Sequence, residues 1–426
     1  MKKSNLKTEI KKLVQDCIES STSHGFPNIV RNENLFIKVL WSLCLVVSFG
    51  YCVYNLKNSF DDYFSYEVNT KITKERMSSI EFPTITFCNK IPFDNLKIFP
   101  IVKKGFKDLK NESLQYFNKT QNTFDIMLKI EYELAYRALQ FKSGIKNFEH
   151  FMLPKFGNCY KFNSGKNSNG ESVKLLNTTI PGVQYGLKLE IFTGYPSNEF
   201  DLIRTNGVHL FIHNSSTIPF SDFDGISIPN GFETNVVVSQ IHSSKLSQPF
   251  SNCIEDPTSK SSFDSNLYRR SIELFSKYQQ KTCLVLCYDE YIQNVCGCSR
   301  PEAFGISINE SCELTKMNCT LNAYRSFYET QLSLECYKSC PVECFTIDYD
   351  YKVSQADFPS PFYADVLIEH GKLYPNYARN FINYDQIKKS VLAVNIYFDD
   401  VSISFLKDNE AKSVNQLVAD IGGFMG

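Results

Sequence analysis

The sequence lacks an excess of charge of either sign: its 426 residues include 45 Lys and Arg against 46 Asp and Glu. It also has a single Trp, and residues 57–412 contain no internal repeat or low-complexity tract. A nucleic-acid-binding chain needs a basic surface and an acidic tail needs a run of carboxylates, so the balance argues against both. What the sequence does have is 43% hydrophobic and 14% aromatic residues, enough to bury a large core.

One apolar run near the N-terminus is long enough to cross a bilayer. Residues 39–56 (VLWSLCLVVSFGYCVYNL) carry no charge and lie between Lys38 and Lys57. A helix lengthened by residues 35–37 would cover a hydrocarbon core about 30 Å thick. We therefore expect a transmembrane helix over residues 35–58. A cleaved signal peptide and a buried core helix are the alternatives, but a polar segment precedes the run and bulky aromatic residues follow it, unlike a signal peptide.

Charges on either side of this run predict its orientation. Before it, seven Lys and Arg outnumber four Asp and Glu, whereas Asp61, Asp62 and Glu67 follow it. The positive-inside rule places residues 1–34 in the cytoplasm and residues 59–411 outside the cell. We therefore expect a multi-pass protein of the plasma membrane.

The orientation sorts the 15 cysteines by compartment. Cys17 lies inside and Cys44 and Cys52 lie in the bilayer, which leaves twelve cysteines in the oxidising exterior. A zinc site at Cys296 and Cys298 is the alternative to disulfides. Zinc sites favour pairs separated by two to four residues in a reducing compartment, so we expect disulfides and no metal. Spacing alone does not choose between the possible pairings.

Six glycosylation sequons fall in the same predicted extracellular segment and none falls in the predicted cytoplasmic one. They begin at Asn111, Asn118, Asn177, Asn214, Asn309 and Asn318.

Hydrophobic patterning predicts a mixed α+β fold between residues 59 and 411. Alternation in Glu81–Cys88 (EFPTITFC) is typical of a strand. Further strands are predicted over residues 186–192, 208–213, 234–241, 344–353 and 391–405. Helical spacing covers residues 109–151, 269–280 and 321–334.

The segment Val414–Gly426 (VNQLVADIGGFMG) is mostly apolar and contains one charged residue, Asp420, followed by the paired Gly422 and Gly423. Its thirteen residues are too few to span a bilayer that needs about 20. A lipid-facing Asp costs about 2.5 to 3.5 kcal/mol near the bilayer centre, so Asp420 is expected to face water or a helix bundle. Glycines are tolerated where backbones approach closely or a helix breaks beside a cavity. The pattern predicts the start of a pore lining, with a flexible glycine tail or the cap of a soluble domain as alternatives.

Four motifs resemble, in order, those of the epithelial sodium channel/degenerin (DEG/ENaC) family, which includes acid-sensing and neuropeptide-gated channels. His24-Gly25 resembles the family's gating motif, and FPTITFCN at residues 82–89 resembles its signature after the first span. The cysteines from Cys253 to Cys344 resemble those of its thumb, and residues 420–426 resemble the start of its pore helix. On a two-span topology, the four together are highly specific.

The resemblance implies a homo- or heterotrimeric sodium channel that amiloride blocks. Two transmembrane helices would flank a disulfide-rich extracellular domain with a β-sheet palm, finger helices in residues 105–151 and a thumb in residues 253–344. Residues 412–426 would begin the second span, cut before a small-residue filter that the family places four residues beyond Gly426. Na⁺ would be the permeant ion, and no cofactor is implied.

The resemblance also implies roles for single residues. Tyr66 and Phe250 would form an aromatic contact between the first span and the thumb, where the family usually has Trp on the thumb side. The implied pore and gating residues are His24, Gly25, Ala419, Asp420, Gly422, Gly423 and Gly426. The implied disulfides are Cys88–Cys159, Cys253–Cys344, Cys283–Cys340, Cys287–Cys336, Cys296–Cys319 and Cys298–Cys312.

Departures from the family narrow the stimulus. Acid-sensing members have a carboxylate-rich pocket, where like charges raise pKa values, but the two thumb positions nearest it are Leu321 and Arg325. The paired histidines after the first span are missing, and the finger region lacks the basic cleavage sites of epithelial channels. Elimination leaves an extracellular neuropeptide as the favoured ligand, with mechanical or proton gating as alternatives.

Two other classes of protein compete with a channel. A single-span receptor or adhesion ectodomain would share the first span, the sequons and the disulfides, but would give no reason for Asp420 and its glycines. An enzyme is not expected, because the sequence has no G-x-S-x-G or H-E-x-x-H motif. His209 and His213 lie in a predicted strand, too far apart to share a metal.

Overall fold

A computed structural model gives the fold. It describes residues 9–14, 16–17, 20, 25–90, 128–129, 148–153, 157–167, 169–193, 205–219, 224–299, 312, 316–369 and 383–425. The chain divides into two compact units, one made of residues 1–70 and 408–426 and the other of residues 71–407.

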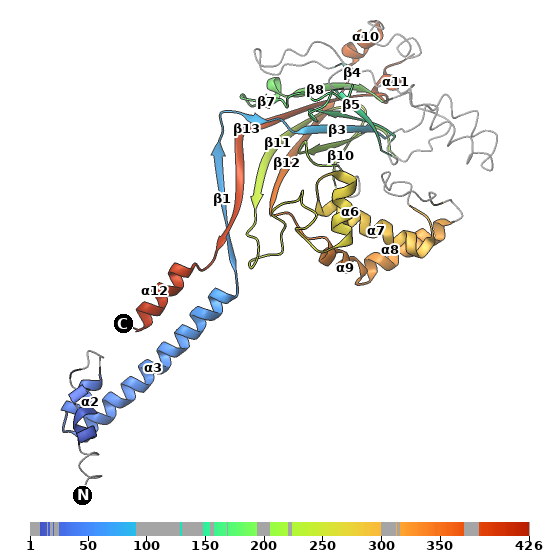
Figure 1. Cartoon of the computed structure of the whole chain (residues 1–426). Helices are drawn as coiled ribbons and strands as arrows, with labels where there is room; N and C mark the ends of the chain where they lie inside the picture. The colour runs from blue at the N-terminus through green and yellow to red at the C-terminus, as the bar shows by residue number, and fades with distance from the viewer. Residues whose placement is uncertain are drawn as a thin grey trace. The chain divides into compact units, whose positions relative to one another are not determined.

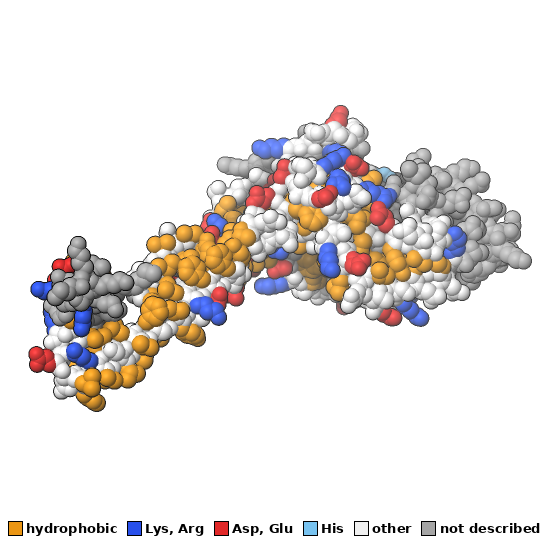
Figure 2. All heavy atoms as spheres, turned by 60° about the horizontal axis from the view of Figure 1, so that its bottom comes forward, with side chains coloured by type: hydrophobic (Ala, Val, Ile, Leu, Met, Phe, Trp, Pro, Cys, Tyr) orange, Lys and Arg blue, Asp and Glu red, His pale blue; other side chains and the backbone are white. Residues whose placement is uncertain are grey.

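The first unit contains one long apolar helix. The helix α3 (Leu35–Phe64) begins at Asn34, whose side chain accepts a hydrogen bond from the Phe36 amide at 3.0 Å. It is the one helix among the described residues that is long and apolar enough to cross a membrane, and Figure 2 shows hydrophobic side chains along it. The short α2 (Phe26–Arg31) packs against it, and α12 (Val414–Met425) lies beside its other end. The helix α3 runs six residues past the predicted end at residue 58.

The second unit is built on two β-sheets (Figure 1). The larger sheet has the order β12-β11-β13-β8-β4, with β1 also pairing β13. The smaller has the order β10-β9-β3-β6-β5, and β2 and β7 form a separate pair. Their bounds are β1 Val68–Arg76, β2 Ile80–Glu81, β3 Thr84–Asn89, β4 Leu128–Lys129, β5 Phe148–Leu153, β6 Gly157–Phe162, β7 Asn177–Thr178, β8 Leu187–Phe192, β9 Val208–His213, β10 Ile226–Ile228, β11 Phe232–Ser244, β12 Phe345–Asp357 and β13 Val391–Glu410.

One hydrophobic core joins the two sheets. Leu187, Val236 and Ile396 of the larger sheet pack in one buried cluster with Ile85 and Phe87 of β3. All six residues of β3 are buried, as expected for a strand at the centre of a covered sheet. The core therefore fixes the positions of β11 and β13, and β13 continues into the first unit.

Four helices and five disulfides form a second module within residues 253–344. The helices are α6 (Asn266–Phe275), α7 (Gln280–Cys296), α8 (Met317–Glu329) and α9 (Leu332–Ser339). A sixth disulfide joins β3 to β6. The six pairs are those that the family resemblance implies: Cys88–Cys159, Cys253–Cys344, Cys283–Cys340, Cys287–Cys336, Cys296–Cys319 and Cys298–Cys312.

Several predicted elements were wrong at their ends. The predicted strand Glu81–Cys88 divides around Pro83, which has no amide N–H to donate to a ladder. The predicted helix over residues 269–280 ends early, because Ser276 adopts a left-handed conformation with φ of 62° and α7 begins at Gln280. The predicted helix over residues 321–334 breaks at Thr330, where α8 gives way to α9.

The predicted finger helices were wrong wherever the structure describes residues 105–151. Residues 128–129 form β4 and residues 148–151 begin β5, which pairs with β6. Pairing with neighbouring strands overrides the local helical spacing there. The rest of that prediction lies outside the described residues.

Two short α-helices also belong to the described part of the second unit. The helix α10 (Pro361–Glu369) and the helix α11 (Tyr384–Lys388) pack beside β8 and β13 through a small cluster that includes Phe192, Leu367 and Ile387.

Candidate functional site

The start of α12 is fixed by a reciprocal capping box. Ser413 precedes the helix, and its hydroxyl accepts a hydrogen bond from the Gln416 amide at 3.3 Å. The Gln416 side chain in turn accepts from the Ser413 amide at 3.0 Å. This Ser-x-x-Gln pattern satisfies two amides that would otherwise lack partners at a helix N-terminus. The helix therefore begins at Val414, and three residues separate it from the end of β13 at Glu410.

The chain leaving α3 lies directly beside the chain that enters α12. The Ala411 amide donates to the Glu67 carbonyl at 2.9 Å. The Thr70 hydroxyl donates to the Asp408 carboxylate at 2.7 Å. These contacts couple α3 and α12 to the paired strands β1 and β13.

A ring of three polar side chains joins α12 to α3. The Lys412 ammonium lies 2.8 Å from an Asp420 carboxylate oxygen and donates to the Ser59 hydroxyl at 2.6 Å. The Ser59 hydroxyl donates to the same Asp420 oxygen at 2.9 Å. Ser59 is 3% exposed, the Lys412 side chain 16% and the Asp420 side chain 39%. The ring is thus a partly buried ion pair closed by a hydroxyl.

A more distant carboxylate and a contact to a backbone carbonyl extend this junction between α3 and α12. Asp62 lies 3.9 Å from the Lys412 ammonium. Further along the two helices, the Cys52 thiol lies 3.2 Å from the Phe424 carbonyl. The polar contacts therefore extend along α3 from Cys52 to Asp62 and reach both the start and the end of α12.

The remaining predicted pore residues of α12 are turned away from contacts within the chain. Ala419, Gly422 and Gly423 are exposed, and a Cβ placed on either glycine would meet no atom within 4 Å. The helix continues through both glycines to Met425, so neither a flexible tail nor a helix break is found there. Packing within this chain does not require the glycines. Gly426 lies outside the described residues.

Gly25 of the predicted gating motif has a structural reason to be glycine. It precedes α2 with φ of 101°, and a Cβ on it would lie 2.8 Å from a methyl carbon of Leu45 in α3. A side chain would be strained by the backbone and blocked by that contact. His24 lies outside the described residues.

Tyr66 and Phe250 belong to different units, so their predicted contact stays a prediction. Tyr66 has φ of 52° and its ring lies 6.4 Å from Tyr63 and 6.3 Å from Phe64. Phe250 follows Pro249, and its amide donates to the Ser247 carbonyl at 3.0 Å.

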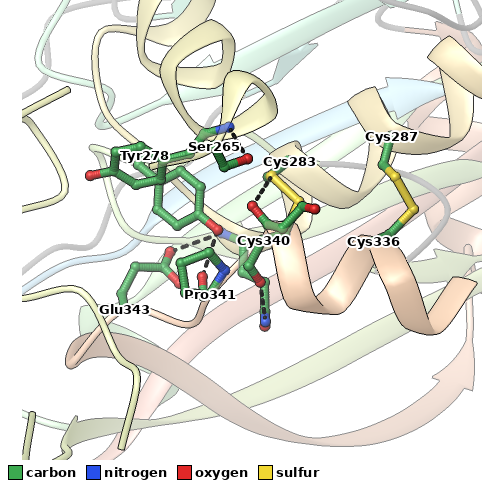
Figure 3. Close-up of a disulfide and its surroundings, with 11 residues drawn as sticks. Ser265, Tyr278, Cys283, Cys287, Cys336, Cys340, Pro341 and Glu343 are labelled. Carbon is green, nitrogen blue, oxygen red and sulfur yellow. Dashed lines mark hydrogen bonds between the residues drawn. A yellow bond between two sulfur atoms is a disulfide. The ribbon is translucent and has the colours of Figure 1, made fainter. Parts of the chain in front are cut away.

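The base of the Cys-rich module is tightly packed (Figure 3). The buried Tyr278 donates its hydroxyl to the Pro341 carbonyl at 2.5 Å, beside the Cys283–Cys340 disulfide. Glu343 accepts from the Gln280 amide at the start of α7, at 3.3 Å. Burial is the main cause that raises the pKa of both Tyr278 and Glu343. This base fixes α7 relative to the chain entering β12.

The two strand histidines are structural in character. His213 lies 2.8 Å from the Thr86 hydroxyl and 3.1 Å from the Thr217 hydroxyl. Burial lowers its pKa from 6.5 to about 4, so the ring is neutral at pH 7. His209 lies 3.2 Å from the Asp224 carbonyl. Among the described residues no group of three or more His, Cys, Asp and Glu is placed to hold a metal ion.

Three of the six predicted glycosylation sites can be placed. Asn177 and Asn318 are exposed, and Asn214 is half-buried with its side chain accepting from the Ser216 amide at 2.9 Å. Asn111, Asn118 and Asn309 lie outside the described residues.

Sequence reasoning found Asp420 but missed its partners Lys412 and Ser59. One signal was present, since Ser59 is a small polar residue next to the apolar run of the first helix. Lys412 gave none, because a lysine between a strand and a helix is ordinary. Their proximity depends on the pairing of β1 with β13, which brings distant parts of the chain together.

Comparison with known proteins defines the class to which this site belongs. The family described as amiloride-sensitive sodium channel matches residues 17–426, which is nearly the whole chain. The chain therefore belongs to the amiloride-sensitive sodium channel family, a family of membrane ion channels and not of enzymes.

The individual relatives have low sequence identity to this chain, but the matches to them are long. The chain is 24% identical to the human bile acid-sensitive ion channel, over 98% of this chain and 83% of that one. It is 28% identical to the epithelial sodium channel subunit gamma of Neoceratodus forsteri, over 66% of this chain and 41% of that one. It is 30% identical to degenerin del-1 of Caenorhabditis elegans, over 66% of this chain and 39% of that one.

Proposed function

We propose that this chain is a subunit of a trimeric, amiloride-sensitive, ligand-gated sodium channel of the plasma membrane. The observation that carries the proposal is the placement of α12. In a chain that matches the family over residues 17–426, α12 begins where β13 ends and packs beside the apolar helix α3. The extracellular unit thus connects through paired strands to both helices.

The proposed orientation puts residues 1–34 in the cytoplasm and residues 71–407 outside. The excess of Lys and Arg before α3 supports it. The six disulfides support it as well, because all lie in residues 88–344 and disulfides persist in oxidising compartments. Asn177 and Asn318, which are exposed in the same unit, would then be accessible to glycosylation.

Gating in this proposal is a shift between closed and open populations. A ligand that binds the open ectodomain more tightly than the closed one raises the open fraction by that difference in affinity. Movement of β1 and β13 would be passed to α3 and α12, whose exposed Ala419, Gly422 and Gly423 face outward from this chain toward the proposed pore. Contact between Tyr66 and Phe250 would be a second route.

The proposed stimulus is an extracellular neuropeptide, and a bile acid is the second candidate. The peptide follows by elimination, since exposed Leu321 and Arg325 stand where acid-sensing members carry carboxylates. The bile acid is favoured by one observation: the relatives that match over 98% of this chain include channels named for sensitivity to bile acids, from human and rat.

Whole-cell recording separates these stimuli. The full-length protein would be exposed in turn to RFamide-type peptides, bile acids, acid and membrane stretch, each with and without amiloride. We expect an amiloride-blocked current with a peptide. A current with bile acid alone would select the second candidate, and a current with acid or stretch alone would refute ligand gating.

A further inference from the structure

We propose that Lys412 is a gating residue that holds Asp420 against Ser59 of α3 and thereby opposes channel opening. The inference rests on the proposed function and names a regulator of the same site. It concerns one chain and one unit, because all three residues lie in the unit formed by residues 1–70 and 408–426.

The ammonium of Lys412 has few alternatives to this position. Its side chain is 16% exposed, so water replaces little of what the ring supplies. The ammonium contacts Asp420 at 2.8 Å and the Ser59 hydroxyl at 2.6 Å, and Asp62 adds a more distant negative charge at 3.9 Å. A buried ammonium without an anion is costly, which ties Lys412 to Asp420.

Ser59 makes the ring directional. A serine hydroxyl has one proton, and here it accepts from Lys412 and donates to Asp420. Because Ser59 is 3% exposed in the packed arrangement, separating the helices would remove both of these partners from its hydroxyl. The ring therefore stabilises the packed arrangement of α12 on α3 more than an exposed ion pair would.

The ring also controls the charge that Asp420 presents. With an ammonium 2.8 Å away, the carboxylate attracts a distant cation much less than an isolated Asp does. A movement of α12 away from α3 would break the ring and free the carboxylate to face permeating cations. Opening would then increase the attraction of cations to Asp420, and closing would decrease it again.

The alternative is that Lys412 only stabilises the fold. A structural role predicts that any loss of Lys412 lowers the amount of channel at the surface. A gating role predicts a larger resting current per surface channel, and it predicts recovery when the two charges are exchanged. The resting current per surface channel separates the two roles. Exchanging the charges with Asp420→Lys and Lys412→Glu tests whether the effect comes from the ion pair, because it restores the pair without the native side chains.

The experiment measures the amiloride-blocked resting current as a fraction of the maximal stimulated current, normalised to surface protein. We expect Lys412→Gln to raise that fraction several-fold, and Lys412→Arg to leave it within two-fold of the parent. The reversals Lys412→Glu and Asp420→Lys should each raise it, and the double variant should return toward the parent. Lys57→Gln is the matched control, because that side chain is 74% exposed and 4.0 Å from Asp61.

An unchanged resting fraction in Lys412→Gln, or double-variant values equal to the sum of the single effects, would overturn the gating role. Thermal melting of the detergent-purified full-length protein gives a second readout that needs no current. Each reversal should lower the melting temperature by several degrees and the double variant should recover it. If the double variant does not recover the melting temperature, the proposed ion-pair ring is wrong even if the channel conducts. If it recovers the melting temperature but no amiloride-blocked current is seen, the proposed function is wrong and the ring is not.

Discussion

At the scale of single residues, the first unit depends on one glycine where α2 meets α3. Gly25 combines φ of 101° with a closest approach of 2.8 Å to Leu45 for any added Cβ. We expect Gly25→Ala to destabilise the protein by about 1 to 3 kcal/mol, the usual cost of a strained backbone. Thermal melting of the purified protein measures this. Gly50→Ala is the matched control: Gly50 lies in α3 with nothing within 4 Å, so its substitution should not destabilise the protein.

The lowered pKa of His213 predicts how the stability of the second unit changes with acid. Its pKa in the folded protein is lowered from 6.5 to about 4, so the folded state disfavours the protonated ring. The contribution to stability is therefore fully present above pH 6.5 and is lost as pH falls toward 4. The loss is about 3.5 kcal/mol at most, taking about 1.4 kcal/mol per pKa unit.

The measurement is the melting temperature of the parent and of His213→Asn between pH 7 and pH 4. The variant keeps a polar side chain but cannot take up this proton, so its melting temperature should fall less with acid. Equal slopes for the two proteins would show that His213 is not the titrating group.

At the scale of elements, the disulfides of the Cys-rich module close loops of very different length. The Cys253–Cys344 disulfide joins residues 91 apart and Cys298–Cys312 joins residues 14 apart. In the chain-entropy model, removing the first should cost about 4 to 5 kcal/mol and the second about 3 kcal/mol. Paired Cys→Ala variants, compared by denaturant unfolding, test this order. A larger loss from the short loop would contradict the entropic account.

Strand positions were predictable from the sequence where alternation was strong, and helix boundaries were less so. The strand β9 lies at Val208–His213 as predicted, and β11 and β13 are longer than predicted. The helix α7 was missed, because its buried residues occupy several faces and leave no single apolar stripe. The disulfide pairs came from the family resemblance and not from spacing.

The candidate site was predictable only in part for a related reason. Asp420, Gly422 and Gly423 stand out locally as an acid and glycines in an apolar segment. Ser59 and Lys412 acquire their roles only through pairing between segments more than 350 residues apart, as the separation of 353 between them shows. No local pattern reports such a contact.

At the scale of the whole molecule, orientation predicts where the protein carries glycans. Asn177 and Asn318 are exposed in the unit that we place outside the cell. Asn177→Gln and Asn318→Gln should each reduce the apparent mass on a gel by about one glycan, and glycosidase treatment should remove the difference. Glycans at neither position, in protein that reaches the cell surface, would argue against the proposed orientation.

In the proposed function, this chain forms part of a sodium-conducting pore. The most direct test records membrane current from cells that express the full-length protein, while extracellular Na⁺ is varied and amiloride is applied. We predict an amiloride-blocked current whose reversal potential shifts with the Na⁺ gradient. Protein at the surface with no amiloride-blocked current, under any stimulus and with any related subunit, would contradict a role in a sodium-conducting pore.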